Sequence, residues 1–171
     1  TGFLNVNDWV QTMGEESAWK FMDALDENTA IYTNSSATPC KFAATGEYVV
    51  GVSTDITAPP LKTKGAPIDI LIPEDKSSWE IEGTAIVKGT KHLDAARKLA
   101  DWAVSRDANL QYNRFMAIVA MPGVANLPPN YPADSEAMMA DYSVPWAVDN
   151  RTRLIAEWTK RYSGKAEKSN Q

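Results

Sequence analysis

The chain contains a short apolar run, Tyr48 to Ser53, that ends on the small polar residues Ser53, Thr54 and Asp55. A run of this length, rich in β-branched residues and preceded by a glycine, is typical of a buried strand. We therefore predict a strand that ends at Ser53. In an open α/β sheet, polar groups at the carboxyl ends of the strands line the crevice where ligands bind.

Other segments repeat this alternation of strand and helix patterns. Further strands are predicted at residues 29–33, 67–72 and 84–87. Helices are predicted at residues 5–13, from Glu15 onward, 39–45, 90–103, 107–115, from Asp134 onward and 145–163, with glycines ending several of them. Strands that alternate with helices predict an α/β fold. The four prolines between residues 122 and 132 predict a rigid connector instead.

Composition narrows the class of protein. The 171 residues are 44% hydrophobic and 23% charged, which suits one globular domain or parts of two lobes. The 17 Lys and Arg residues are outnumbered by 22 Asp and Glu residues, so a nucleic-acid partner is not expected. Cys40 is the only cysteine, so no internal disulfide can form. No apolar run approaches the roughly 20 residues of a membrane helix.

Four segments, in their order along the chain, carry a resemblance to a known family. They are Thr1-Gly2-Phe3-Leu4, the run from Gly46 to Ser53, the segment from Ala85 to Trp102, and Ala156-Glu157-Trp158-Thr159-Lys160-Arg161-Tyr162. In these segments the chain resembles the periplasmic solute-binding proteins of ABC importers. The similar branch holds the ferric-iron-binding and 2-aminoethylphosphonate-binding proteins.

The resemblance implies a periplasmic-binding-protein-like (type II) α/β fold, in which ligand is held between two lobes. Members are considerably longer, so the chain is expected to be the second half of a two-lobe protein. Residues 1–82 would form most of the second lobe, residues 83–121 would return to the first lobe, and residues 122–171 would supply C-terminal helices on the second lobe. The implied location is periplasmic, and the implied partner is an ABC permease in the membrane. A homo-oligomer is also possible, because residues 83–121 would expose apolar surface without the first lobe.

Candidate ligand-binding residues fall at helix starts and strand ends. Thr1, Gly2 and Phe3 open a helix, whose free N–H groups suit an anion. The resemblance implies that Thr1 and Gly2 are the last two residues of a ligand-contacting Ser-Gly-Thr-Gly turn. Ser35 and Ser36 precede the helix at residues 39–45, where hydroxyls and N–H groups can form an anion nest. The alternatives are an ordinary helix entry and a turn whose serines bind local backbone.

Two further candidate contacts carry negative charge. Asp55 can pair with a ligand ammonium, and the neighbouring Thr54 can donate to an oxyanion. The alternative is that Asp55 caps the next segment. Glu82 lies near the expected crossing between lobes with Trp79 and Glu80, and one of these glutamates can bind an amine. The alternative there is a packed tryptophan and two solvated glutamates.

These residues favour binding over catalysis, so we expect no enzyme activity, no cofactor and no metal site. The predicted ligand is a small anion resembling 2-aminoethylphosphonate. One alternative is ferric iron or another small oxyanion, although Ser53-Thr54-Asp55-Ile56 lacks the tyrosines that ferric-binding relatives use here. Another is a serine-dependent α/β hydrolase, for which His92 is the sole candidate base. We interpret His92 as a surface residue and Cys40 as a small buried one. A last alternative is that the chain is inactive without its first lobe.

Overall fold

The computed structural model describes residues 2–115, 118–124, 126–127, 129–133 and 135–168. Thr1, Asp134 and part of the segment 116–120 therefore lie outside the described residues. The helices are α1 (Gly2–Met13), α2 (Glu15–Asn28), α3 (Thr38–Thr45), α4 (Ala58–Thr63), α5 (Leu93–Ala103), α6 (Arg106–Tyr112), α7 (Val144–Tyr162) and the short 3-10 helix η1 (Ser163–Lys165). Within the described ranges, no helix is long and apolar enough to cross a membrane.

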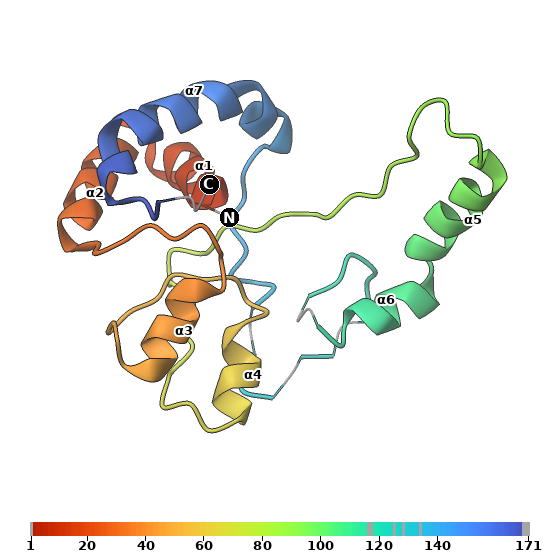
Figure 1. Ribbon diagram of the computed structural model, residues 1–171, viewed down its shortest axis with the longest axis horizontal. Coiled ribbons are helices and arrows are strands. Elements are labelled where there is room, and N and C mark those ends of the chain that lie inside the picture. Colours follow the sequence, from red (N-terminus) through yellow and green to blue (C-terminus); the bar gives the residue numbers. More distant parts are fainter. Residues whose placement is uncertain (1, 116–117, 125, 128, 134, 169–171) are drawn as a thin grey trace.

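The main core lies between α1, α2 and α7, which form one group in Figure 1. Its buried residues are Val6, Val10, Ala18, Trp19, Met22, Leu154 and Tyr162. The predicted break between the first two helices is confirmed, because Gly14 adopts φ +80° between α1 and α2. Glycine reaches this left-handed region without the steric cost that other residues meet. The buried residues of α2 and α7 recur at helical spacing, so each helix presents one apolar face to the core.

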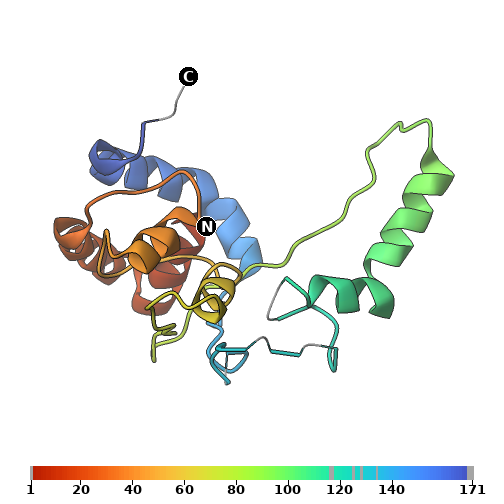
Figure 2. The ribbon, with the colours of Figure 1, turned by 60° about the horizontal axis from the view of Figure 1, so that its bottom comes forward.

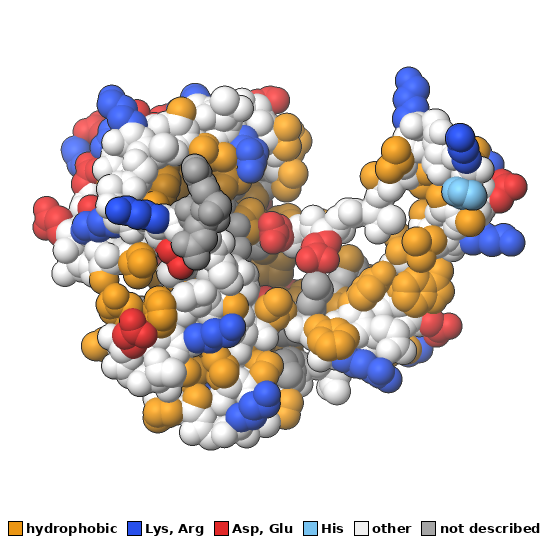
Figure 3. All heavy atoms as spheres, in the orientation of Figure 1, with side chains coloured by type: hydrophobic (Ala, Val, Ile, Leu, Met, Phe, Trp, Pro, Cys, Tyr) orange, Lys and Arg blue, Asp and Glu red, His pale blue; other side chains and the backbone are white. Residues whose placement is uncertain are grey.

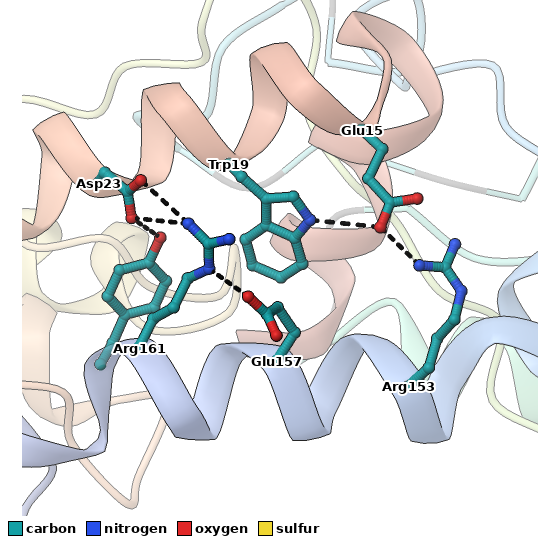
Figure 4. A network of polar contacts seen from close by, with 7 residues as sticks. Glu15, Trp19, Asp23, Arg153, Glu157 and Arg161 are labelled. Carbon is teal, nitrogen blue, oxygen red and sulfur yellow. Dashed lines mark hydrogen bonds and ion pairs between the residues drawn. The ribbon is translucent and has the colours of Figure 1, made fainter.

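A network of charged groups joins α2 to α7 beside this core (Figure 4). Arg153 Nη1 lies 2.6 Å from Glu15 Oε1. Arg161 contacts Asp23 at 3.0 Å, and it contacts Glu157 of its own helix at 2.6 Å. The Arg161 guanidinium also lies 5.0 Å from the centroid of the Trp19 ring, which is a cation–π geometry. The network therefore links α7 to α2 at two points, Arg153 with Glu15 and Arg161 with Asp23.

The described part of the chain contains no sheet. The predictions of strands at residues 29–33, 48–53, 67–72 and 84–87 are therefore wrong. Two isolated bridges occur instead, Tyr32 with Ala166 and Ser77 with Met139. Val49 and Val50 are 99% and 77% exposed, so the apolar run near the predicted site is extended but not buried. A strand requires a hydrogen-bonded neighbour, and the local sequence pattern does not reveal whether one lies beside it.

An extended segment from Trp79 to His92 leads away from the core to α5 and α6 (Figures 1 and 2). We call residues 81–115 the arm. None of the described residues of α5 is buried, although its apolar residues share one face. The helix predicted at residues 90–103 begins only at Leu93. His92 occupies the N-cap position, and Thr90 Oγ1 accepts from the His92 N–H at 3.2 Å. α6 is capped by Ser105, whose hydroxyl oxygen accepts from the Ala108 N–H.

The chain leaves the core at residues 77–80 and returns at residues 138–143, and these two passes lie together. We call them the crossing. Trp79 Nε1 donates to Ala140 O at 2.6 Å, and the Trp79 ring stacks on Tyr142 with centroids 5.2 Å apart. Ser78 Oγ donates to Asn5 Oδ1 at 2.9 Å. The crossing is therefore attached to α1.

Candidate ligand-binding site

The predicted binding residues before and after α3 are brought together by a hydrogen bond between two loops. Ser53 Oγ donates to the backbone oxygen of Ser36 at 2.7 Å, across a separation of 17 residues. This bond places the segment that carries Thr54 and Asp55 beside the loop that carries Ser35 and Ser36. These two groups of polar residues lie together as predicted, but loops bring them together and not the edge of a parallel sheet.

Gly51 permits this close approach. A Cβ atom on Gly51 would lie 2.2 Å from Pro39 O and 3.0 Å from the Cys40 nitrogen. Those atoms belong to the first turn of α3, which begins at Thr38, so that Pro39 is its second residue and not the first as predicted. Only a residue without a side chain lets the extended segment lie against the helix start at this distance.

Some polar groups of this site already make hydrogen bonds within the protein, and others do not. The hydroxyl oxygen of Ser35 accepts from the Ala37 N–H at 3.4 Å, so the local-turn alternative describes Ser35. The amides of Thr38 and Lys41 donate to loop carbonyls at 3.2 Å, and Pro39 has no N–H. Two groups of the first turn of α3 are thus already bonded. An anion would rely mainly on side-chain hydroxyls.

Two such hydroxyls are unengaged. The Ser36 hydroxyl makes no hydrogen bond to another described residue, and Ser36 takes part in the loop contact only through its carbonyl. The Thr54 hydroxyl oxygen is buried and also has no hydrogen-bond partner within the described ranges. A buried polar atom without a hydrogen-bond partner costs free energy. A bound ligand that bonds to the Thr54 hydroxyl would remove this cost.

Asp55 lies at the exposed side of the site. Its Oδ2 accepts a hydrogen bond from the hydroxyl of Tyr131 at 3.2 Å. Burial raises the pKa of Tyr131 above its ordinary value, and the charge of Asp55 raises it further. The phenol therefore stays protonated at neutral pH and can donate. No local sequence pattern pointed to Tyr131, which lies in the segment interpreted as a proline-rich connector.

The other predicted site residues lie elsewhere. Gly2 is exposed at the start of α1, and Phe3 packs against the core with the Arg151 guanidinium 5.4 Å from its ring centroid. Glu82 is exposed on the arm. Among the described residues, no hydrogen bond or ion pair joins Gly2, Phe3 or Glu82 to the site around Ser36 and Ser53. Trp79 packs in the crossing, as its alternative interpretation held.

The two residues considered for nucleophilic chemistry are not part of this site. His92 caps α5, and the single pale-blue side chain in Figure 3 lies on the arm, away from α3. Cys40 is 5% exposed, and burial raises the pKa of its thiol. Its interpretation as a small buried residue is confirmed. Of the residues that the structure describes, no group of three or more His, Cys, Asp and Glu side chains is arranged to hold a metal ion.

Comparison with known proteins identifies a family of binding proteins. The family described as bacterial extracellular solute-binding protein matches residues 4–140. An uncharacterized protein of Haemophilus influenzae is 27% identical over 164 residues, which are 94% of this chain and 47% of that protein. The chain thus spans about half the length of this relative.

A solved structure is similar in fold. It is the periplasmic binding protein AfuA from Actinobacillus pleuropneumoniae with exogenous fructose-6-phosphate bound, with a TM-score of 0.80 and 27% identity. The match covers 95% of this chain and 52% of AfuA. The predicted periplasmic-binding-protein-like fold and periplasmic location are confirmed by these matches, and so is the class of binding protein rather than enzyme. The chain belongs to the bacterial extracellular solute-binding protein family.

Proposed function

We propose that this chain forms part of the solute-binding component of an ABC importer and binds a small organic phosphonate or phosphate. The observation that supports this most is the Ser53–Ser36 hydrogen bond of 2.7 Å. It joins the loop that carries Ser36 to the segment that carries Thr54 and Asp55. Hydroxyl donors suit the anionic end of such a ligand, and a carboxylate suits an ammonium or hydroxyl at its other end.

Two ligand classes share this chemistry. 2-Aminoethylphosphonate carries an ammonium and a phosphonate, which corresponds to the branch that the sequence resembles. AfuA was solved with fructose-6-phosphate, which carries several hydroxyl groups and a phosphate. In both, one end is anionic and the other is a hydrogen-bond donor. We favour the phosphonate, because Asp55 would gain a charge-assisted hydrogen bond from an ammonium.

The proposed mechanism is closure of two lobes around the ligand. The arm, most of which falls in the predicted first-lobe segment 83–121, would carry contacts from the other lobe to the ligand. The helix α5 supports this role, since it has an apolar face but no buried residue. Ligand that touches both lobes would shift the open–closed equilibrium toward the closed state, which an ABC permease would then recognise. Thr1, Gly2, Phe3 and Glu82 remain proposed contacts of that closed state.

Calorimetry tests the proposal on the longest natural polypeptide that contains this chain. 2-Aminoethylphosphonate and fructose-6-phosphate are titrated separately, with a thermal-shift measurement for each. Thr54→Val removes the buried hydroxyl and keeps the shape, so we expect about tenfold weaker binding with no fall in Tm. Ser163→Ala, in η1, is the matched control and should bind normally. Absence of both heat and thermal shift with both ligands would contradict the proposal, as would unchanged binding by Thr54→Val.

A further inference from the structure

Tyr131 reaches the candidate site from a distant part of the chain. It stands 76 residues after Asp55, and its hydroxyl donates to Asp55 Oδ2 at 3.2 Å. Tyr131 is partly buried whereas Asp55 is exposed, so the ring is the more enclosed partner. Within the described ranges, this is the hydrogen bond that the Asp55 side chain makes, and its Oδ1 is unengaged.

The backbone beside Tyr131 is anchored separately. Asn130 adopts φ +67°, a left-handed conformation that asparagine tolerates better than most residues. Its side-chain nitrogen donates to Thr63 Oγ1 at 3.2 Å. Thr63 in turn donates to Pro59 O at 2.8 Å within α4. The backbone next to Tyr131 is thus anchored to α4 independently of the bond between Tyr131 and Asp55.

An anchored donor on one carboxylate oxygen restricts the rotation of the whole carboxylate group. An exposed aspartate without such a partner samples several rotamers, and a ligand that binds it must order it first. The buried Thr54 hydroxyl, one residue earlier, also has no partner among the described residues. Two consecutive residues thus carry unengaged groups, the Asp55 Oδ1 acceptor and the Thr54 hydroxyl, which can donate as well as accept.

We propose that Tyr131 is a positioning residue that fixes the Asp55 carboxylate and thereby selects ligands carrying a hydrogen-bond donor opposite their anionic group. This inference rests on the proposed function, because it assigns the selectivity of that same site. Tyr131 itself acts through Asp55 and need not touch the ligand.

The test compares two ligands that differ in one group. 2-Aminoethylphosphonate carries an ammonium, and ethylphosphonate lacks it. Calorimetry uses the longest natural polypeptide that contains this chain, with and without Tyr131→Phe. We expect the variant to bind 2-aminoethylphosphonate about fivefold more weakly and ethylphosphonate within about twofold of the wild type. Equal losses for both ligands, or no loss for either, would overturn the inference.

A control separates positioning from general stability of the segment. Asn130→Gly removes the bond to Thr63 and keeps access to the left-handed backbone. It should change the affinity for both ligands equally. Asp55→Asn should remove the preference for the ammonium ligand, and adding Tyr131→Phe to it should cause no further loss of that preference. A further loss in the double variant would overturn the inference.

A spectroscopic readout distinguishes this inference from the proposed function. Tyrosine labelled with ¹³C at Cζ reports the titration of each phenol by NMR, and Tyr131→Phe assigns the signal. Asp55→Asn should move the pKa of Tyr131 down toward the ordinary phenol value of about 10. A Tyr131 signal that does not respond overturns the inference even if ligand binds. If the signal responds but wild-type protein binds neither ligand, the residue pair exists, and the proposed phosphonate function and the selectivity role fail together.

Discussion

Gly51 lies against the backbone of Pro39, at a separation that no side chain could occupy. A Cβ atom at position 51 would lie 2.2 Å from Pro39 O and 2.5 Å from Pro39 C. Both are backbone atoms of α3, so they cannot move aside as the end of a flexible side chain could. This contact sets how closely the segment carrying Thr54 approaches the helix.

Replacing Gly51 with alanine should therefore destabilise the protein. We expect Gly51→Ala to lower the free energy of unfolding by about 2 kcal/mol, because the segment or α3 must shift. Urea denaturation followed by circular dichroism measures the change. Gly164→Ala is the matched control, since a Cβ there meets no atom within 4 Å, and it should change the free energy by less than about 0.5 kcal/mol. Equal effects of both variants would contradict the crowding at Gly51.

Arg161 should contribute more to stability than the exposed ion pair on α2. It contacts Asp23 and Glu157 and also lies over the Trp19 ring. We expect Arg161→Ala to cost about 1–2 kcal/mol, because two carboxylates and an aromatic face lose one shared partner.

Lys20→Ala serves as the comparison for Arg161→Ala. Lys20 pairs with Glu16 in the exposed i,i+4 arrangement, with side chains 75% and 84% exposed. Such a pair contributes about 0.5 kcal/mol or less. Urea denaturation of both variants at low and high salt checks the difference. A loss for Arg161→Ala no larger than that for Lys20→Ala would argue against a cooperative network.

Asp8 should make stability depend on pH. Its side chain is 5% exposed, and its Oδ1 has no hydrogen-bond partner among the described residues. Burial, and secondly the nearby Asp75 charge, raise the pKa of the Asp8 carboxyl. The folded state therefore favours the neutral acid. The cost of ionising Asp8 is absent below its unfolded pKa, grows as pH rises to the folded pKa, and is complete above it.

The variant Asp8→Asn should accordingly raise Tm at pH 7, where the wild-type carboxylate is ionised at a cost. At pH 3 the acid is neutral in both folded and unfolded states, and Tm should be nearly unchanged. Thermal unfolding at the two pH values measures this. Asp75→Asn removes only the smaller cause and should raise Tm by less. An equal rise for Asp8→Asn at both pH values would show that charge is not the reason.

The apolar face of α5 should make the 171-residue chain associate with itself. Leu99 is 62% exposed and Trp102 is 47% exposed. Leu99 also lines a shallow cavity of about 180 Å³ between α5 and residues 84–90. Apolar surface of this kind favours association with a second surface.

Light scattering after size-exclusion chromatography checks this expectation. We expect dimers or larger species at high concentration, and at least about tenfold weaker association in Leu99→Gln. Lys98→Gln changes the adjacent exposed residue and should associate like the wild type. A strictly monomeric chain at all concentrations would contradict the prediction.

Most of the helices were predictable because their signals are local. The exceptions are α4, which was not predicted, and the helix expected from Asp134 onward, because residues 135–138 form turns. Gly14 separates two apolar periodic segments, and Pro39 and Gly46 bound a third, so a few neighbouring residues decide each boundary. Thr90 shows the limit of such signals. A threonine before an apolar periodic segment is a reasonable cap, but the helix begins after His92. The start of α5 lies three residues after Thr90, because the Thr90 hydroxyl accepts from the His92 N–H in the preceding loop.

The sheet was not predictable in the same way. The run around Val50 has the composition of a buried strand, yet its burial depends on a neighbour that the run does not encode. The candidate site contains residues that could be predicted from the sequence and one that could not. Ser36 and Thr54 could be nominated because each follows an extended segment, and Ser53 joins their loops. Tyr131 could not, because a contact across 76 residues leaves no trace in a local pattern.

The stacked rings of Trp79 and Tyr142 lie where the outgoing and returning passes of the chain meet on α1. Any rotation of the arm about the core must twist both passes at this point. The indole emission of Trp79 depends on its stacked neighbour and on water access. The protein thus contains an intrinsic fluorophore at its pivot, and the Trp79 signal, isolated by Trp79→Phe subtraction, would follow the angle between the two parts in real time.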